Sequence, residues 1–354
     1  MSPSPEILEA RTELDAIEQM HRAGMTDGLP VIVPTEDRVE RMLLGVSLDP
    51  DVLLGVVGPL DGAATVEKVA INAVMAGCLP EHLPVVVAAI EAITTPAFDI
   101  GAVQATTHNC APLFIVNGPA RGFNGPIAHG TGALGAGHRA NAAIGRAVRL
   151  VLVNIGGGRP GVGDMAQLGH PGKFAYCIAE DEDNDPWTPL HVRRGFLPES
   201  SAVTALAAEA PHSIRVRVQT DRDAQQLLRA AGMSLASIGS NNVQFGKGNV
   251  LVILNPEYAA ALADPDIAEV QRAIYESAWQ PTALLEEIHG DTIDLRGDRM
   301  HVVADPADIL LIVAGDGGGY SAVVPTWGGG PHGSIAVTAA IREHDVCDYS
   351  GVPS

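Results

Sequence analysis

The hydrophobic pattern of the chain alternates between short apolar runs and longer segments with helical spacing. The runs DVLLGVVG (51–58), APLFIVNG (111–118), NVLVILNP (249–256) and DILLIVAG (308–315) are short, continuous and bounded by turn residues. Such runs predict buried strands. The segment SIRVRVQT (213–220) alternates apolar and polar positions instead, which is typical of a half-buried strand.

Between these runs, apolar residues recur three and four positions apart, which predicts helices. The alternation of strands with helices favours an α/β fold with largely parallel sheets. Helices are predicted at 1–24, after Thr35, at 63–77, 81–93, 139–154 and 221–232, and in two segments before Trp279.

The spacing of apolar runs and helical segments changes near residue 205, after a loop-rich stretch at 164–200. We therefore predict two α/β halves, 1–205 and 206–354. Glycine-rich loops occur in both halves, and we expect them to form a site between the halves.

The charge balance excludes two classes of partner. The net charge is −20, and only three of the 22 basic residues are lysines, namely Lys68, Lys173 and Lys247. An acidic surface repels nucleic acids and anionic membranes. No apolar run reaches the ~18–20 residues that a membrane-spanning helix needs. We therefore expect neither nucleic acid nor a membrane as a partner.

The cysteines and the N-terminal segment indicate a cytoplasmic protein. Cys78, Cys110, Cys177 and Cys347 are widely spaced and form no CxxC motif. The first 22 residues are acidic and amphipathic, without the pattern of a signal peptide. We expect free thiols in a reducing cytoplasm.

The loop GTGALG (130–135) has the G-x-G-x-x-G spacing of a dinucleotide site, but its surroundings do not fit one. That site needs a strand ending at the first glycine, whereas the predicted strand ends near Asn117. No Asp or Glu occurs from 101 to 163 to bind a ribose. A helix is predicted just after Gly137, and its free N–H groups favour a small anion such as a carboxylate or phosphate.

An acid-free stretch of 64 residues, 100–163, contains five arginines. Arg139 lies in the first turn of the predicted helix, where a cation opposes the helix dipole unless an anion lies beside it. We therefore predict that His138 and Arg139 belong to an anion site. For Arg146 and Arg149, pairing with acids from elsewhere in the chain is an equal alternative.

His108 and Cys110 lie two residues apart, just before a predicted strand. If this piece is extended, both side chains point to the same side. A thiol beside an imidazole can be an activated nucleophile, so both residues are catalytic candidates. The alternative is that Cys110 is a small buried hydrophobic residue and His108 bonds to the backbone.

Two of the few lysines occur in settings that suggest a function. Lys173 follows His170 in the segment GHPGK, and Lys68 is flanked by apolar positions. A shielded lysine can act as a base or hold an anion. We therefore name Lys173 as a catalytic candidate, with Lys68 and His170 as substrate-binding candidates. Alternatively, each lysine pairs with an acid.

Ligands of open α/β sheets bind beyond the carboxyl ends of the strands. Asn117 ends one predicted strand, and a long glycine-rich loop follows another at residue 315. The alternative for that loop is a mobile surface segment. Its polar and aromatic candidates are Asp316, Tyr320, Ser321, Trp327 and His332.

The histidines leave a divalent metal open, because several lie in glycine-rich loops. No HxH or HExxH spacing supports a metal, and no GxSxG or Walker A motif is present. We therefore predict neither a metal nor a cofactor. The histidines concerned are His108, His129, His138, His170 and His332.

Several long segments resemble a family of bacterial proteins of unsettled function, which is loosely akin to the UGSC group of selenoproteins and their cysteine forms. The resemblance covers about residues 25–200, and more faintly the segment DILLIVAGDGGGYSAVVPTWG. It implies an enzyme-like site without supplying a reaction. The U-G-S-C tetrad is absent here, so no redox residue carries over. The segments are TDGLPVIVPTEDRV (26–39), TVEKVAINAVMAGCLPEHLPVVVAAIEA (65–92), LGAGHRANAAIGRAVRLVLVNIGGGRPG (134–161) and LGHPGKFAYCIAEDEDNDPWTPLHVRRGF (168–196).

These observations favour an enzyme that acts on a small anionic or polar metabolite by lyase or hydrolase chemistry. His108 or His138 would be the acid–base group, Arg139 and Lys173 would hold the anion, and Cys110 would be a nucleophile. We expect a homo-oligomer. The alternatives are a thiol-based redox or metal-dependent protein, and a ligand-binding protein without catalysis.

Overall fold

The computed structural model describes most of the chain. Cys347 lies outside the described residues, as do the start of the helix predicted at 1–24 and part of the strand predicted at 213–220. The described ranges are 8–122, 125–217, 220–290 and 294–342.

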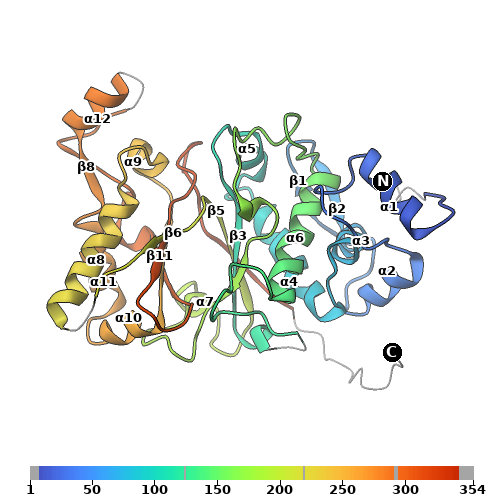
Figure 1. The fold of residues 1–354 in the computed structure, drawn as a ribbon, viewed down its shortest axis with the longest axis horizontal. Coiled ribbons are helices and arrows are strands. Elements are labelled where there is room, and N and C mark those ends of the chain that lie inside the picture. Colours follow the sequence, from blue (N-terminus) through green and yellow to red (C-terminus); the bar gives the residue numbers. More distant parts are fainter. Residues whose placement is uncertain (1–7, 123–124, 218–219, 291–293, 343–354) are drawn as a thin grey trace.

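Among the described residues, two four-stranded sheets lie face to face, and helices cover the outer face of each (Figure 1). The molecule therefore has four layers, in the order helices, sheet, sheet, helices. The first sheet has the order β12 (Val337–Ala340), β5 (Ala202–Ala208), β3 (Ala111–Asn117), β4 (Cys177–Ala179). The second has the order β10 (Ile309–Val313), β7 (Val250–Leu254), β11 (Ser321–Val324), β6 (His212–Ile214).

The period of two along each strand builds this arrangement, because successive side chains point to opposite faces. In β3, Leu113 and Ile115 pack between the sheets, whereas Phe114 and Val116 pack under the helices. The strand β7 follows the same rule. Strands buried on both faces read as continuous apolar runs, which is the pattern seen in the sequence.

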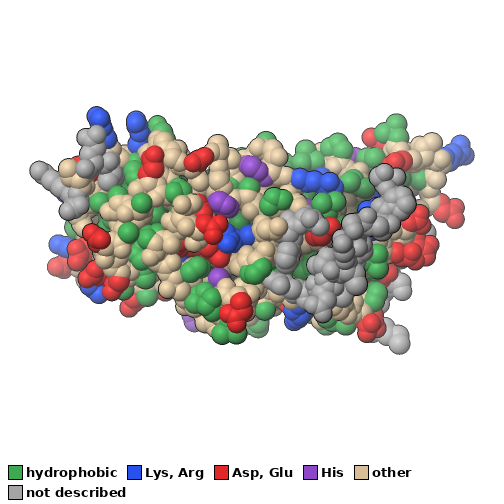
Figure 2. Space-filling view, turned by 90° about the horizontal axis from the view of Figure 1, so that it is seen from below, with side chains coloured by type: hydrophobic (Ala, Val, Ile, Leu, Met, Phe, Trp, Pro, Cys, Tyr) green, Lys and Arg blue, Asp and Glu red, His purple; other side chains and the backbone are tan. Residues whose placement is uncertain are grey.

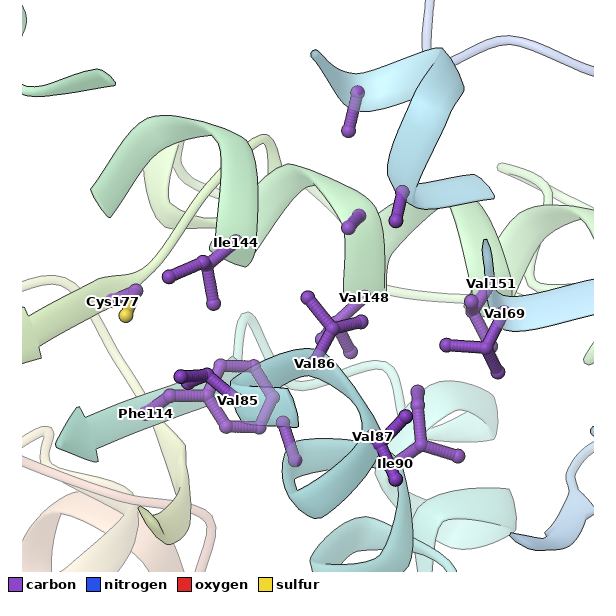
Figure 3. Packing of buried hydrophobic residues seen from close by; sticks show 14 of the residues in the cluster. Val69, Val85, Val86, Val87, Ile90, Phe114, Ile144, Val148, Val151 and Cys177 are labelled. Atoms are coloured by element: carbon purple, nitrogen blue, oxygen red, sulfur yellow. The ribbon is translucent and has the colours of Figure 1, made fainter. Parts of the chain in front are cut away.

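The outer layers are built from the predicted helices. Beside the first sheet lie α4 (Leu83–Ile93) and α6 (Arg139–Asn154), whose apolar side chains meet Phe114 of β3, and α3 (Val66–Ala76) packs on both helices (Figure 3). Beside the second sheet lie α8 (Asp221–Leu235) and α11 (Ile267–Tyr275). No helix in the described ranges is long and apolar enough to cross a membrane.

The remaining elements lie around these layers. The hairpin of β8 and β9 with α12 projects from one end of the molecule (Figure 1). These elements are α1 (Glu13–Arg22), α2 (Glu36–Leu43), β1 (Leu53–Val57), β2 (Gly62–Thr65), α5 (Ile100–Ala105), α7 (Leu190–Arg193), α9 (Asn241–Phe245), α10 (Pro256–Ala261), β8 (Trp279–Pro281), α12 (Thr282–His289) and β9 (Arg299–His301).

The prediction of an α/β fold is confirmed, but the sheets are mixed. Each has one parallel pair, β3 with β4 and β7 with β10. The strands β5 and β11 run antiparallel to both of their neighbours. The apolar pattern did not reveal these two strands, so the sheets were expected to be more parallel than they are.

The two sheets exchange their outer strands. In each half a central strand, β3 or β7, is followed by helices, a parallel edge strand and an antiparallel strand. The chain then crosses over, so that β6 joins the second sheet and β12 returns to the first. The boundary predicted at residue 205 falls inside β5. Along the chain, β6 of the second sheet therefore follows β5 of the first, and β12 of the first sheet follows β11 of the second.

We expect this exchange and the shared apolar layer to make the protein unfold as one unit. Differential scanning calorimetry should show a single transition with a ratio of van't Hoff to calorimetric enthalpy of about 1. Two separate transitions would show instead that the halves are independent domains.

Candidate functional site

Sheet register brings His108 and Glu209 together from positions 101 apart in sequence. Ala111, the first residue of β3, is paired with Ala208, the last residue of the antiparallel strand β5. A residue just before β3 therefore lies beside a residue just after β5. His108 and Glu209 occupy these positions, at the edge of the first sheet where β3 begins, which we call the amino edge.

His108 is held by one ring nitrogen and leaves the other free. Its Nε2 lies 2.8 Å from Oε1 of Glu209, and the two side chains are 18% and 30% exposed. Its Nδ1 is enclosed and has no hydrogen-bond partner in the described part of the chain. A carboxylate that accepts the Nε2 proton fixes the tautomer, which leaves a lone pair on Nδ1.

The backbone of Glu209 is fixed from two sides. Its N–H donates to the carbonyl of Pro325 at 2.8 Å, and its carbonyl accepts the hydroxyl of Tyr176 at 2.8 Å. Tyr176 directly precedes β4, the parallel neighbour of β3. The pair of His108 and Glu209 is therefore held in place by the starts of β3 and β4, the end of β5, and Pro325 in the loop after β11.

His170 and Lys173 reach the same edge through the short helix η3 (Pro171–Lys173) before β4. Nδ1 of His170 accepts from the Gly172 N–H, so Nε2 carries the proton and donates to the carbonyl of Ala208 at 3.2 Å. Burial lowers the pKa of His170, and the charges of Lys173, Glu209 and His108 also act on it. His170 is therefore a neutral, fixed neighbour of the pair.

Lys173 and Arg149 both bind the Asp164 carboxylate, with nitrogen–oxygen distances of 3.0 Å. Both cations line a narrow cleft beneath the start of β3, with free space for about one water molecule. Gln104 lines it as well, and its buried Nε2 makes no hydrogen bond to any described residue. The polar wall of the cleft therefore has more donors than acceptors and one net positive charge.

Cys110 does not have the environment of a nucleophile. It does not share a side with His108, because its N–H bonds to the carbonyl of His108 and the segment is not extended. The thiol is 1% exposed in the core under the helices, and burial raises its pKa to about 12. A thiol reacts through its thiolate, so this geometry favours the buried hydrophobic alternative.

The expected anion site at His138 and Arg139 has structural partners instead. Arg139 is exposed, and its guanidinium donates to the carbonyl of Gly77 at 3.1 Å, at the C-terminus of α3. A cation is favourable at a helix C-terminus, which explains its place in the first turn of α6. His138 bonds to the carbonyl of Thr131. Lys68 lies on α3 and contacts the carbonyl of Ala63, away from the amino edge.

Other predicted residues lie apart from the amino edge or inside the core. Asn117 is buried at the opposite end of β3, where the strand ends, and Asp316 bonds Thr131 on that side. Trp327 is 6% exposed and belongs to the core. Tyr320 and His332 are exposed. The structure therefore brings together His108, His170 and Lys173, with Cys110 buried in the core nearby, but not the residues of the glycine-rich loops.

Sequence reasoning missed four residues of this cluster, namely Glu209, Asp164, Tyr176 and Gln104. The sequence positions of two of them could have indicated their role. Glu209 is the first charge after the apolar run SAVTALAA, and Asp164 is the first acid after the stretch 100–163. An acid that follows so many unpaired cations is a natural partner for them.

No group of three or more histidine, cysteine, aspartate or glutamate side chains is placed to hold a metal ion within the described ranges. Comparison with family models, curated proteins and solved structures found no match. The resemblance to the bacterial family therefore stays a prediction.

Asp164→Asn should destabilise the fold strongly, because it leaves Lys173 and Arg149 shielded without a carboxylate. Removing one partner of a buried ion pair costs about 3–5 kcal/mol of unfolding free energy. Urea unfolding of the variant and the wild type measures this difference. The control is Glu13→Gln, which breaks the exposed pair with Arg38 and should cost about 1 kcal/mol or less. A loss as small as the control's would contradict the role of Asp164.

The buried thiols should be unreactive in the native protein. Burial raises the pKa of Cys110 and Cys177 to about 12, and that of Cys78 further still. In a Cys347→Ser variant, which leaves only these three, Ellman's reagent at neutral pH should label no thiol until denaturant is added. Rapid labelling of Cys110 in the folded variant would restore it as a candidate nucleophile.

Proposed function

We propose that the protein is an enzyme that acts on a small anionic or polar metabolite at the amino edge, by lyase or hydrolase chemistry. The observation that supports this proposal is the pair of His108 and Glu209 with a free Nδ1, beside a cleft with excess positive charge. An acid–base group next to an anion subsite is what such a reaction needs.

His108 is the acid–base group of this proposal. This role requires that substrate binding opens a path to the enclosed Nδ1, which then accepts a proton from a water molecule or from the substrate. The resulting imidazolium is stabilised by Glu209 at 2.8 Å. The same nitrogen then returns the proton to the leaving group. The carboxylate fixes the tautomer and orientation of the ring, as the acid of a catalytic triad does.

Lys173 and Arg149 supply the attraction for an anion. Asp164 neutralises one of the two charges, so one positive charge remains for the substrate. The buried amide nitrogen of Gln104 gives an unused donor in the same cleft. Arg149 thus takes the role that the sequence suggested for Arg139.

The alternatives are less well supported. A thiol-based redox protein needs a reactive cysteine, and Cys110 is buried with a raised pKa. A binding protein without catalysis would use the cleft but would not need the free nitrogen of His108. We also keep a cytoplasmic, homo-oligomeric protein as part of the proposal.

A metabolite screen can test the acid–base role. Small carboxylates, phosphate esters and neutral polar metabolites are tested for thermal stabilisation and then for turnover. For a turned-over compound, His108→Asn should lower kcat/KM about 10²–10⁴-fold and Glu209→Gln by a smaller factor.

The matched control is His301→Asn in the projecting hairpin, which should leave kcat/KM unchanged. Equal activity of His108→Asn and wild type would refute the catalytic role. Stabilisation by a compound that is never turned over would favour the binding protein.

A further inference from the structure

A second polar cluster lies at the opposite edge of the molecule, where β3, β4 and β10 end. Figure 2 views this face, and acidic, basic and histidine side chains gather near its middle. Glu180 and Asp181 follow β4 directly, and Asn117 ends β3. None of these residues is needed for the proposed reaction, yet Glu180 is completely buried.

Glu180 has too few donors for a buried carboxylate. Its Oε2 accepts hydrogen bonds from Nδ2 of Asn117 and from the N–H of Leu190, the latter at 2.9 Å. Its Oε1 lies 3.6 Å from the Arg193 guanidinium, beyond hydrogen-bond distance, and no described residue donates to it. An enclosed anionic oxygen without a donor is costly.

Asp185 explains the lone oxygen. Its carboxyl group lies next to that of Glu180, and its Oδ2 is likewise buried with no donor among the described residues. Two ionised carboxylates are both acceptors only, so they bond to each other only when one carries a proton. Burial raises the pKa of both groups, that of Glu180 to about 8.

The neighbouring charges do not remove the need for this proton. Arg193 of α7 faces both carboxyl groups, and its attraction is smaller than the effect of burial. Glu182 is held by Arg121 at 3.1 Å and adds repulsion to Asp185. The other titratable groups here are Asp181 with His129 at 3.4 Å, and His191, which lies 3.8 Å from Glu182.

The segment that contains both carboxyl groups ties the two sheets together. The N–H of Asp181 donates to the carbonyl of Val313 on β10 at 2.8 Å, and Arg193 donates to the carbonyl of Leu311 on the same strand. The indole N–H of Trp187 donates to the carbonyl of Pro265 in the second half. The segment 180–194 thus crosses from the first sheet to the second.

We propose that Glu180 and Asp185 share one proton and form a pH-sensitive latch that holds segment 180–194 across both sheets. With the proton present, the two carboxyl groups bond to each other and the segment stays closed. When the proton is lost, two enclosed negative charges face each other and repel, so the bonds from the segment to β10 and Pro265 weaken.

The direction of the pH effect follows from the raised pKa. The unfolded state loses the proton near the ordinary pKa of glutamate, whereas the folded state keeps it to a higher pH. The pair therefore stabilises the fold most in acid. This stabilisation decreases as the pH rises from about 5 and is lost by about pH 8. For one proton, the unfolding equilibrium constant rises about tenfold per pH unit over this range.

Glu180→Gln tests the latch, because the amide is neutral at every pH and can donate to Asp185. Urea unfolding at several pH values gives the unfolding equilibrium constant of each protein, and the value for the wild type is divided by that for the variant. This ratio should rise about tenfold per pH unit between about pH 5 and pH 8. A ratio that stays constant overturns the proposal.

Glu13→Gln is the control, since it removes an exposed carboxylate that pairs with Arg38 and does not act on the pair of Glu180 and Asp185. Its ratio to wild type should not change with pH over the same range. Hydrogen exchange adds a local readout. Peptides from 180–194 should lose protection above about pH 8 in the wild type but not in Glu180→Gln. Equal protection at both pH values in the wild type contradicts the latch.

A measurement on the wild type alone covers the case in which Glu180→Gln fails to fold. With both glutamate and aspartate labelled with carbon-13, infrared difference spectra between about pH 6 and pH 10 should show the loss of one protonated-carboxyl band. Absence of that band at the lower pH shows that both carboxyl groups are ionised there and overturns the proposal.

Discussion

The face-to-face contact between the two sheets is the constraint on which the rest of the structure depends. Each central strand has helices on one side and the other sheet on the opposite side, so it has no polar face. Polar and charged groups are therefore confined to the edges, where strands begin and end. Strand register then decides which of them meet. Because β3 is antiparallel to β5 and parallel to β4, three distant segments supply His108, Glu209 and Lys173 to one edge.

The same constraint explains the arrangement of charge. The acid-free stretch 100–163 contains the central strand β3 and the helix α6, and its arginines find their partners elsewhere. Arg146 pairs with Asp27, Arg149 with Asp164 and Arg121 with Glu182. The pairing alternative was therefore correct for Arg146, whereas Arg149 both pairs and lines the cleft. Acids are placed where the strands end, which leaves the buried faces free of charge.

Much of the fold could be predicted from the apolar pattern, including α6 at 139–154 and the strands β3, β7 and β10. The strand β5 was missed because its sequence, AVTALAA, is rich in alanine, which favours helices in isolation. Its conformation is imposed by its two neighbours and by burial on both faces. Likewise, His108 and Lys173 could be named from local context. Their partners Glu209 and Asp164 could not, because pairing over long separations depends on the register of strands.

A crystal structure with the most stabilising metabolite bound would show whether chemistry takes place at the amino edge. We expect the ligand's acidic group to lie by Lys173 and Arg149, with its reacting atom within hydrogen-bond reach of Nδ1 of His108. A ligand bound at the opposite edge, or in the glycine-rich loop at 130–135, would contradict this expectation.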